Sequence, residues 1–171
     1  TTIQPLIRKE YYETSTYKKH DNLFTITIIG GSQGAKIFDE LLNKSFVSIA
    51  KQASIKLIHQ TSEKNINFLK DFYFRNNIES KVFSFDHNLS EVLNQGDLCI
   101  TRAGASSLAE LSFLNIPFIA IPLPSSKDNH QYENAKYYEE QDCCWIIDQK
   151  NFDDQKFEKF LLKLINKSQD Y

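Results

Sequence analysis

FTITIIGGSQG, residues 24–34, joins a run of β-branched and aromatic residues to a glycine-rich turn. A run of this kind is typical of a buried strand. After the turn, apolar residues recur at helical spacing: Ile37, Phe38, Leu41, Leu42, Phe46 and Ile49. The stretch therefore predicts a strand, a glycine turn and a helix, which is the opening unit of a parallel α/β sheet.

The same alternation continues to the C-terminus. Further strands are predicted at residues 55–59, 81–85, 98–101, 118–121 and 143–147. Helices are predicted near residues 65–76, 89–95, 107–114 and 129–141, and from residue 153 onward. The fold class is α/β, a Rossmann-like parallel sheet of about six strands with helices on both faces. Ligands of such sheets bind beyond the carboxyl ends of the strands, so function is expected in the loops there.

Length and charge limit the class of protein. The 171 residues make one domain of ordinary size. Residues 1–22 are polar, rich in tyrosine and aperiodic, and we interpret them as a linker or approach segment outside the core, with the domain itself at 23–171. The net charge of -2 and the scattered lysines argue against nucleic-acid binding.

The cysteines and the apolar runs bear on the cellular compartment of the protein. The cysteines number 3, at 99, 143 and 144, and form a poor disulfide framework, which favours a reducing compartment. The longest apolar run, 116–123, is too short to span a bilayer and contains prolines. The chain also has no methionine, which suggests that it was processed or excised from a longer protein.

The first predicted loop contains Gly31, Ser32 and Gln33. Glycines allow close backbone approach, and the N-terminus of the following helix offers unpaired N–H groups, so this loop can hold a phosphate. Glycines in such loops also serve merely to turn the chain, and the motif alone does not distinguish phosphate binding from a simple turn.

The loop after residue 101 offers a second such helix start, with Ala105, Ser106 and Ser107 as candidate phosphate contacts. Two interpretations remain open for Glu110. With Ser107 it fits a capping box, in which a Glu three residues into the helix returns to the N-cap amide. Alternatively, its two oxygens accept both hydroxyls of a ribose.

Hydrogen-bonding side chains gather after residue 121, where His130, Gln131 and Asn134 could meet the hydroxyls of a sugar. The alternative is that Asp128 or Asn129 simply caps the next helix. Phe85 and Asp86 end another predicted strand and could frame a base or form a turn. His59 is interpreted as structural, and the histidine spacing argues against a metal site.

Four segments in order, GGSQGAK at 30–36, HQT at 59–61, TRAGASSLAEL at 101–111 and PLPSSKDNHQYENAK at 122–136, resemble the MurG family. Members transfer N-acetylglucosamine from UDP-N-acetylglucosamine to an undecaprenyl-diphosphate-linked N-acetylmuramyl-pentapeptide. The resemblance implies a GT-B glycosyltransferase, with this chain as its C-terminal, donor-binding domain. It also implies a cytoplasmic location at the inner face of the bacterial plasma membrane.

The resemblance also implies roles for single residues. The roles are diphosphate binding for Gly31, Ser32, Gln33, Ala105, Ser106 and Ser107, ribose binding for Glu110, uracil binding for Arg8, Phe85 and Asp86, and sugar binding for His130, Gln131 and Asn134. No metal or other cofactor is implied. The general base and the lipid-linked acceptor site are expected in an N-terminal domain that this sequence lacks.

Two other functions are compatible with the sequence. One is the donor subunit of another lipid-linked UDP-sugar glycosyltransferase, such as the eukaryotic dolichol-linked enzyme. The other is a non-catalytic nucleotide-binding module. The residues Pro5, Leu6, Ile7 and Arg8 before the first strand favour the MurG family.

Overall fold

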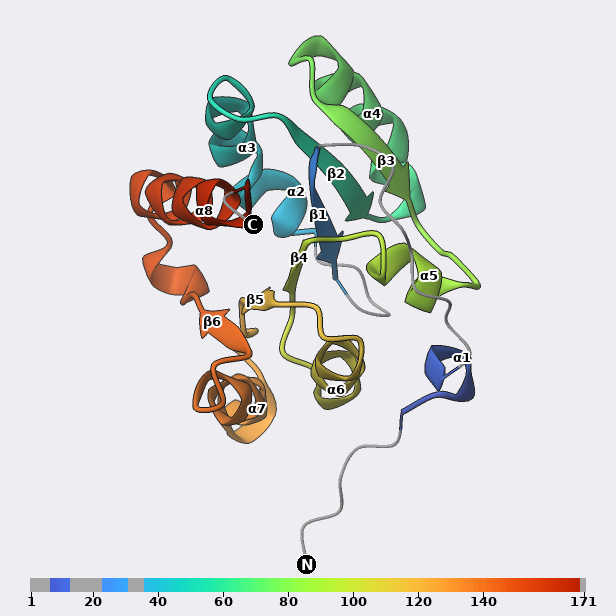
Figure 1. Ribbon diagram of the computed structural model, residues 1–171, viewed down its shortest axis with the longest axis vertical. Coiled ribbons are helices and arrows are strands. Elements are labelled where there is room, and N and C mark those ends of the chain that lie inside the picture. Colours follow the sequence, from blue (N-terminus) through green and yellow to red (C-terminus); the bar gives the residue numbers. More distant parts are fainter. Residues whose placement is uncertain (1–6, 13–22, 31–35, 170–171) are drawn as a thin grey trace, which may run out of the picture.

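The computed structural model describes residues 7–12, 23–30 and 36–169 of the chain. These residues contain a six-stranded sheet in which all neighbouring strands are parallel, in the order β3-β2-β1-β4-β5-β6 (Figure 1). The strands are β1 Phe24–Ile29, β2 Ile55–Gln60, β3 Glu79–Phe83, β4 Leu98–Thr101, β5 Phe118–Ala120 and β6 Cys144–Ile146. The predicted parallel α/β sheet is confirmed.

Helices connect successive strands. The α-helices are α1 Lys9–Tyr12, α2 Phe38–Leu41, α3 Asn43–Ala50, α4 Ile66–Arg75, α5 Leu89–Leu93, α6 Ala105–Phe113, α7 His130–Glu139 and α8 Asp154–Gln169. Short 3-10 helices are η1 Glu63–Asn65, η2 Lys127–Asn129 and η3 Gln149–Asn151. In the described part of the chain, no helix has both the length and the apolar character that a bilayer crossing needs.

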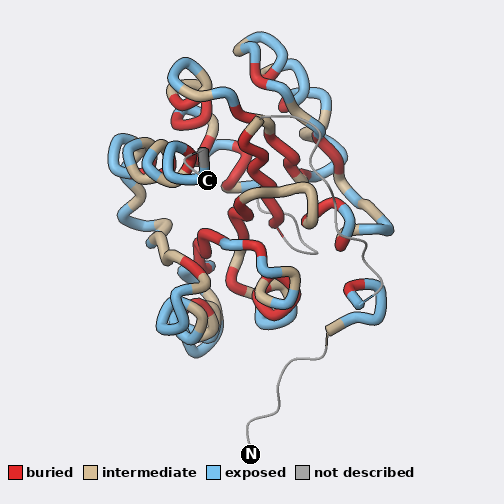
Figure 2. The backbone as a smooth tube through the Cα atoms, viewed as in Figure 1, coloured by how far each residue is buried: buried red, intermediate tan, exposed pale blue. Residues whose placement is uncertain are grey.

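The sheet has an apolar layer on each face. On one face, Ile26 and Ile28 of β1 share a buried cluster with residues of α2, α3, α4 and α8. On the other face, Ile29 shares a second cluster with residues of α5, α6 and α7. Figure 2 shows the buried strands at the centre and the exposed outer sides of the helices around them. β1 is buried along its whole length, which explains its nearly continuous apolar sequence.

The first predicted helix is broken in the structure. Its apolar face is as expected, with Phe38, Leu42, Phe46 and Ile49 fully buried. The helix divides at Leu42, where α2 ends and α3 begins. The side-chain amide of Asn43 donates to the backbone carbonyl of Asp39 at this break, a local side-chain bond that competes with a continuous helix.

The predicted strand at 81–85 is shifted by two residues, to Glu79–Phe83. Its pairing with β2 ends where Gln60 meets Phe83. The chain then turns, because the Asp86 carboxylate accepts a hydrogen bond of 3.0 Å from the Asn88 backbone N–H. Phe85 therefore lies beyond the strand, with 71% of its surface exposed.

Part of the predicted linker belongs to the core. Residues 1–6 and 13–22 lie outside the described residues, but Lys9–Tyr12 form α1, and Tyr11 is only 2% exposed within the second cluster. Tyr12 adds a ring contact to Phe113 of α6, with centroids 4.8 Å apart. The expectation that this segment takes no part in the core is therefore wrong at Tyr11. A single buried aromatic in a four-residue helix leaves no periodic signal in the sequence.

Candidate functional site

The strand order has its switch point at β1. From β1 the chain first builds outward through β2 and β3, and then returns to the other side through β4. The helices that follow β1 and β4, α2 and α6, therefore pack on opposite faces of the sheet. In open α/β sheets, this switch point is where ligands bind. The end of β1 lies directly beside that of β4, because Ile29 pairs with Thr101.

Helix α6 begins at this switch point. Its N-cap is Gly104, in an extended conformation and without a side-chain hydrogen bond to the helix. Ala105 and Ser106 are exposed, and Ser107 is half-buried. The first N–H groups of this helix thus have no capping side chain and face an accessible surface, which is the arrangement that attracts a phosphate.

The capping-box interpretation of Glu110 is wrong. The helix starts two residues earlier than predicted, so Ser107 lies in its first turn and Glu110 in its second. A capping box requires the acidic residue three positions after the N-cap, and Ser107 occupies that position. Glycine at the N-cap gave no side-chain signal for the true start.

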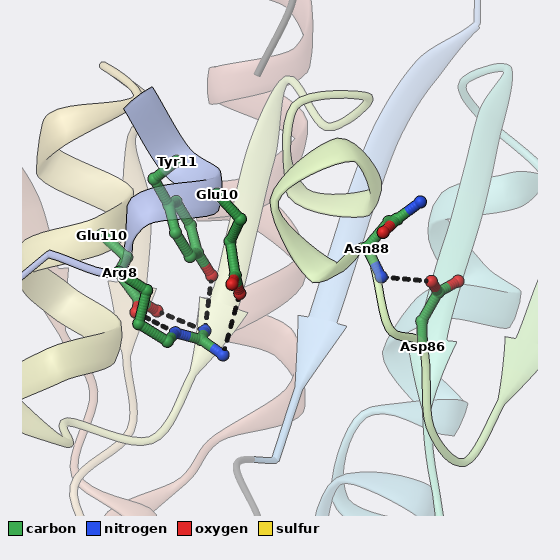
Figure 3. A network of polar contacts seen from close by, with 6 residues as sticks. All are labelled: Arg8, Glu10, Tyr11, Asp86, Asn88 and Glu110. Atoms are coloured by element: carbon green, nitrogen blue, oxygen red, sulfur yellow. Dashed lines mark hydrogen bonds and ion pairs between the residues drawn. The ribbon is translucent and has the colours of Figure 1, made fainter. Parts of the chain in front are cut away.

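Glu110 is instead held by Arg8. Its side chain is only 4% exposed, and its two oxygens accept from Nε and Nη2 of Arg8 at 2.7 and 3.0 Å (Figure 3). The same guanidinium donates to the Tyr11 hydroxyl at 2.8 Å and lies 3.2 Å from the Glu10 carboxylate. The hydrogen bond to Glu110 raises the pKa of Arg8 further above its usual range, and burial raises that of Tyr11.

The structure thus brings together residues expected to hold uracil and ribose. Arg8 uses one acceptor position on each oxygen of Glu110, whereas a carboxylate offers about four. Arg8 is half exposed, so its side chain can share the carboxylate with a ligand or swing away from it. The ion pair of Arg8 and Glu110 lies at α6, about one helical turn after the N–H groups that lack a capping side chain.

Phe85 and Asp86 lie on a different element, the loop between β3 and α5. The Asp86 carboxylate accepts from Asn88 and lies 3.3 Å from Lys81 Nζ, and the hydrogen bond from Asn88 lowers its pKa. The exposed Phe85 ring packs edge-on against His87, with centroids 4.8 Å apart. The Asp86 side chain therefore makes the turn, and the exposed ring of Phe85 is the group available to a ligand.

The candidate sugar residues lie at the start of α7. His130 Nδ1 is 2.7 Å from the Lys127 carbonyl, Gln131 Oε1 accepts from Leu123 N at 2.9 Å, and Asn134 Nδ2 donates to the Ala103 carbonyl at 3.1 Å. Gln131 and Asn134 thus connect α7 to the loops after β5 and β4.

The alternative prediction, that this segment simply caps the next helix, is wrong for Asn129. Asn129 occupies the N-cap of α7, but its side chain makes no capping hydrogen bond. Asp128 and Asn129 both have positive φ, at 50° and 54°. Consecutive non-glycine residues in this conformation are strained, and such strain collects at functional loops.

Gly31, Ser32 and Gln33 lie outside the described residues, so their predicted role at the diphosphate stays a prediction. Helix α2 directly follows this segment and carries Asp39, which is 2% exposed. Among the residues that the structure describes, no three His, Cys, Asp or Glu side chains gather as a metal site requires.

Comparison with known families shows the family of the chain. Residues 25–171 match the model of the glycosyltransferase family 28 C-terminal domain. The chain belongs to this family. The match includes the loops after β4 and β5, and thereby the uncapped start of α6 and the start of α7.

Similar proteins agree with the glycosyltransferase family 28 assignment. The chain is 41% identical over 169 residues to the UDP-N-acetylglucosamine--N-acetylmuramyl-(pentapeptide) pyrophosphoryl-undecaprenol N-acetylglucosamine transferase of Pelagibacter ubique, covering 99% of this chain and 48% of that protein. The enzyme of the same name from Rickettsia massiliae is 42% identical over 151 residues, covering 86% and 40%.

A solved structure gives the same fold. The crystal structure of Acinetobacter baumannii MurG has a TM-score of 0.79 and 25% identity, covering 96% of this chain and 46% of that one. This chain thus spans less than half the length of these three relatives.

Two groups in this glycosyltransferase family 28 domain were not assigned roles from the sequence. One is Arg102, which lies in the segment at 101–111 and makes its contacts only in the folded chain. The second group surrounds His59, which is fully buried with Nδ1 2.7 Å from the Tyr73 hydroxyl and Nε2 3.4 Å from Asp39. The structural interpretation of His59 is consistent with this burial, but nothing in the sequence indicated its partners.

Proposed function

We propose that this chain is the donor-binding domain of an inverting glycosyltransferase. The enzyme would move N-acetylglucosamine from UDP-N-acetylglucosamine to undecaprenyl-diphosphate-linked N-acetylmuramyl-pentapeptide. The names of the relatives support the donor and the acceptor, and the family match supports the position of the chain in a GT-B enzyme. The action would take place at the cytoplasmic face of the membrane.

One observation carries the proposal: an uncapped helix N-terminus and a buried carboxylate lie on the same helix at the switch point of the sheet. Glu110 follows Ala105 by five residues, or about 7.5 Å along the helix axis at 1.5 Å per residue. A nucleoside diphosphate presents phosphate oxygens and ribose hydroxyls at a comparable separation. The helix start would hold phosphate through N–H groups, and Glu110 would accept the ribose hydroxyls.

The same arrangement supports the chemistry. When an acceptor hydroxyl displaces UDP from the anomeric carbon, negative charge develops on the leaving diphosphate. N–H groups at the start of α6, with the hydroxyls of Ser106 and Ser107, would stabilise that charge. Gly31, Ser32 and Gln33 are proposed to add to this site. His130, Gln131 and Asn134 are proposed to line the sugar, and the base that deprotonates the acceptor would come from outside this domain.

The experiment that tests the proposal is titration of the chain with nucleotides by calorimetry. We expect UDP and UDP-N-acetylglucosamine to bind, with GDP about tenfold weaker and NAD not detected, since a larger base does not fit contacts made for uracil. Equal affinity for GDP and UDP would rule out the uracil assignment.

The exposed ring of Phe85 gives a separate test. We expect Phe85→Ala to weaken UDP binding about fivefold, because stacking of a base on an aromatic ring contributes roughly 1 kcal/mol or more. Phe74→Ala is the matched control, since Phe74 is 81% exposed and lies on α4, outside the proposed site. Equal affinities of the two variants would exclude Phe85 from the base site.

A further inference from the structure

Arg102 connects three parts of the chain near the switch point of the sheet. It is the first residue after β4, and its Nη1 donates to the carbonyls of Ile121 and Pro122 at 2.9 and 3.3 Å. Its guanidinium carbon lies 5.0 Å from the centre of the Phe38 ring, at the start of α2. Arg102 therefore contacts the chain that leaves β5 and the helix that follows the glycine-rich segment, while it belongs to the loop that leads into α6.

These contacts begin where the sheet ends. The last backbone bond between this loop and the chain after β5 runs from Ile121 N to the Thr101 carbonyl, at 2.8 Å. Beyond it, the side chain of Arg102 satisfies the carbonyls of two buried residues that the sheet no longer reaches. Only Ala103 separates Arg102 from the N-cap of α6, so these bonds fix the direction in which that helix starts.

Arg102 also lacks an acidic partner. Within the described ranges no carboxylate lies at ion-pair distance from it, although burial lowers its pKa and so disfavours its charge. Arginine cannot give up its proton in proteins, so the positive charge stays. An anion that binds nearby would therefore stabilise the half-buried, unneutralised charge of Arg102 at the carboxyl end of β4.

We propose that Arg102 is a positioning residue for the diphosphate of the donor. It holds the start of α6, the start of α2 and the chain after β5 in one arrangement, and its charge complements the bound anion. This inference deepens the proposed function and rests on it. A guanidinium is needed, because Nη1 bonds two carbonyls while the rest of the planar group lies over the Phe38 ring, a geometry that a compact ammonium group does not reproduce.

The alternative is that Arg102 only stabilises the fold, and Phe38 separates the two roles. Phe38 is fully buried and cannot touch a nucleotide, so any effect of Phe38→Leu on affinity must act through its neighbours. Phe46 is also fully buried but lies on α3, and Phe46→Leu is the matched control. Thermal midpoints identify the variants that remain folded.

The experiment measures the affinity of each variant for UDP by calorimetry and for uridine by ligand-observed NMR. We expect Arg102→Gln to weaken UDP binding about tenfold, the scale of a charge-assisted hydrogen bond. Arg102→Lys keeps the charge but not the guanidinium contacts and should weaken it about threefold, with uridine affinity within about twofold for both variants. Phe38→Leu should weaken UDP binding about threefold, but add nothing in the Arg102→Gln background, since residues in contact are coupled. Phe46→Leu should leave affinity unchanged.

Each contrary result has one meaning. UDP affinity of Arg102→Lys equal to that of the unaltered chain would overturn positioning in favour of charge alone. Equal losses for uridine and UDP, or additive effects of Phe38→Leu and Arg102→Gln, would overturn it in favour of a purely structural role. Full UDP affinity in Arg102→Gln would overturn this inference only, whereas failure of the unaltered chain to bind UDP would overturn the proposed function with it.

Discussion

Replacing Asp39 with alanine is expected to lower the free energy of unfolding by about 3 to 5 kcal/mol, the range for breaking a buried charged network. The Asp39 carboxylate is buried and accepts hydrogen bonds of 2.6 Å from both Thr61 Oγ1 and Asn65 Nδ2. Its other oxygen faces His59 Nε2. Alanine would leave the Thr61 hydroxyl and the Asn65 amide without their acceptor, at a site where water cannot easily replace it.

Urea denaturation and the thermal midpoint measure this loss. For a domain of this size, each kcal/mol shifts the midpoint by about 2 to 4 °C, so a decrease on the order of 10 °C is expected. Asp71→Ala is the control, because Asp71 is exposed and pairs with Arg75 one turn along α4, a contact worth about 0.5 kcal/mol or less. A loss at Asp39 no larger than that at Asp71 would show that the network contributes little.

Asp39→Asn separates charge from hydrogen-bond capacity. The amide can still accept from Thr61 and Asn65 if its NH₂ group faces His59, which then acts as an acceptor. We expect a loss of about 1 to 2 kcal/mol near neutral pH, the difference between charged and neutral hydrogen bonds.

This difference should depend on pH. Burial disfavours the Asp39 charge, but hydrogen bonds from His59, Thr61 and Asn65 outweigh it, so its pKa is lowered in the folded chain. A depressed pKa stabilises the fold above the unfolded-state value of about 4, and this contribution is lost as pH falls through the folded value. The unfolding free energies of wild type and Asp39→Asn should therefore converge at acid pH.

The sequence predicted most of the sheet because burial on both faces imposes continuous apolar runs. β1 and β4 have the predicted bounds, since both are fully buried and each is followed directly by a glycine or a polar residue. Errors occur where a single residue, rather than the apolar pattern, sets the boundary. Asn43 breaks the first helix, Asp86 turns the chain after β3, and Gly104 caps α6 without a side chain.

The candidate site was predictable only in part. Strand order and glycine-rich loops indicated the edge of the sheet at which function lies. Contacts between residues distant in sequence were not predictable, because no periodic pattern connects Arg8 with Glu110 or Arg102 with Phe38. These contacts form only after the sheet has brought the loops together. The sequence therefore predicted the chemical role of single residues better than it predicted which residues contact them.

Glu110→Gln is expected to weaken UDP binding by about tenfold to a hundredfold. A carboxylate that accepts ribose hydroxyls makes charge-assisted hydrogen bonds worth roughly 1.5 to 3 kcal/mol, and 1.4 kcal/mol is tenfold in affinity. Glutamine has the same shape but one acceptor oxygen fewer and no charge. Calorimetry measures the affinity, and the thermal midpoint measures the stability of the same samples.

Stability should change much less than affinity. Glutamine removes one of the two oxygens to which Arg8 donates, together with the charge. Because the Arg8 side chain is half exposed, it can bond water instead, so the thermal midpoint should move by only about 2 to 4 °C. Glu10→Gln is the matched control: Glu10 contacts the same guanidinium at 3.2 Å, but its side chain is 45% exposed and lies on α1. That variant should bind UDP like the unaltered chain. If Glu110→Gln also bound UDP normally, the ribose role would be wrong; if it bound normally but unfolded far more easily, Glu110 would serve only to hold Arg8 and α1 in place.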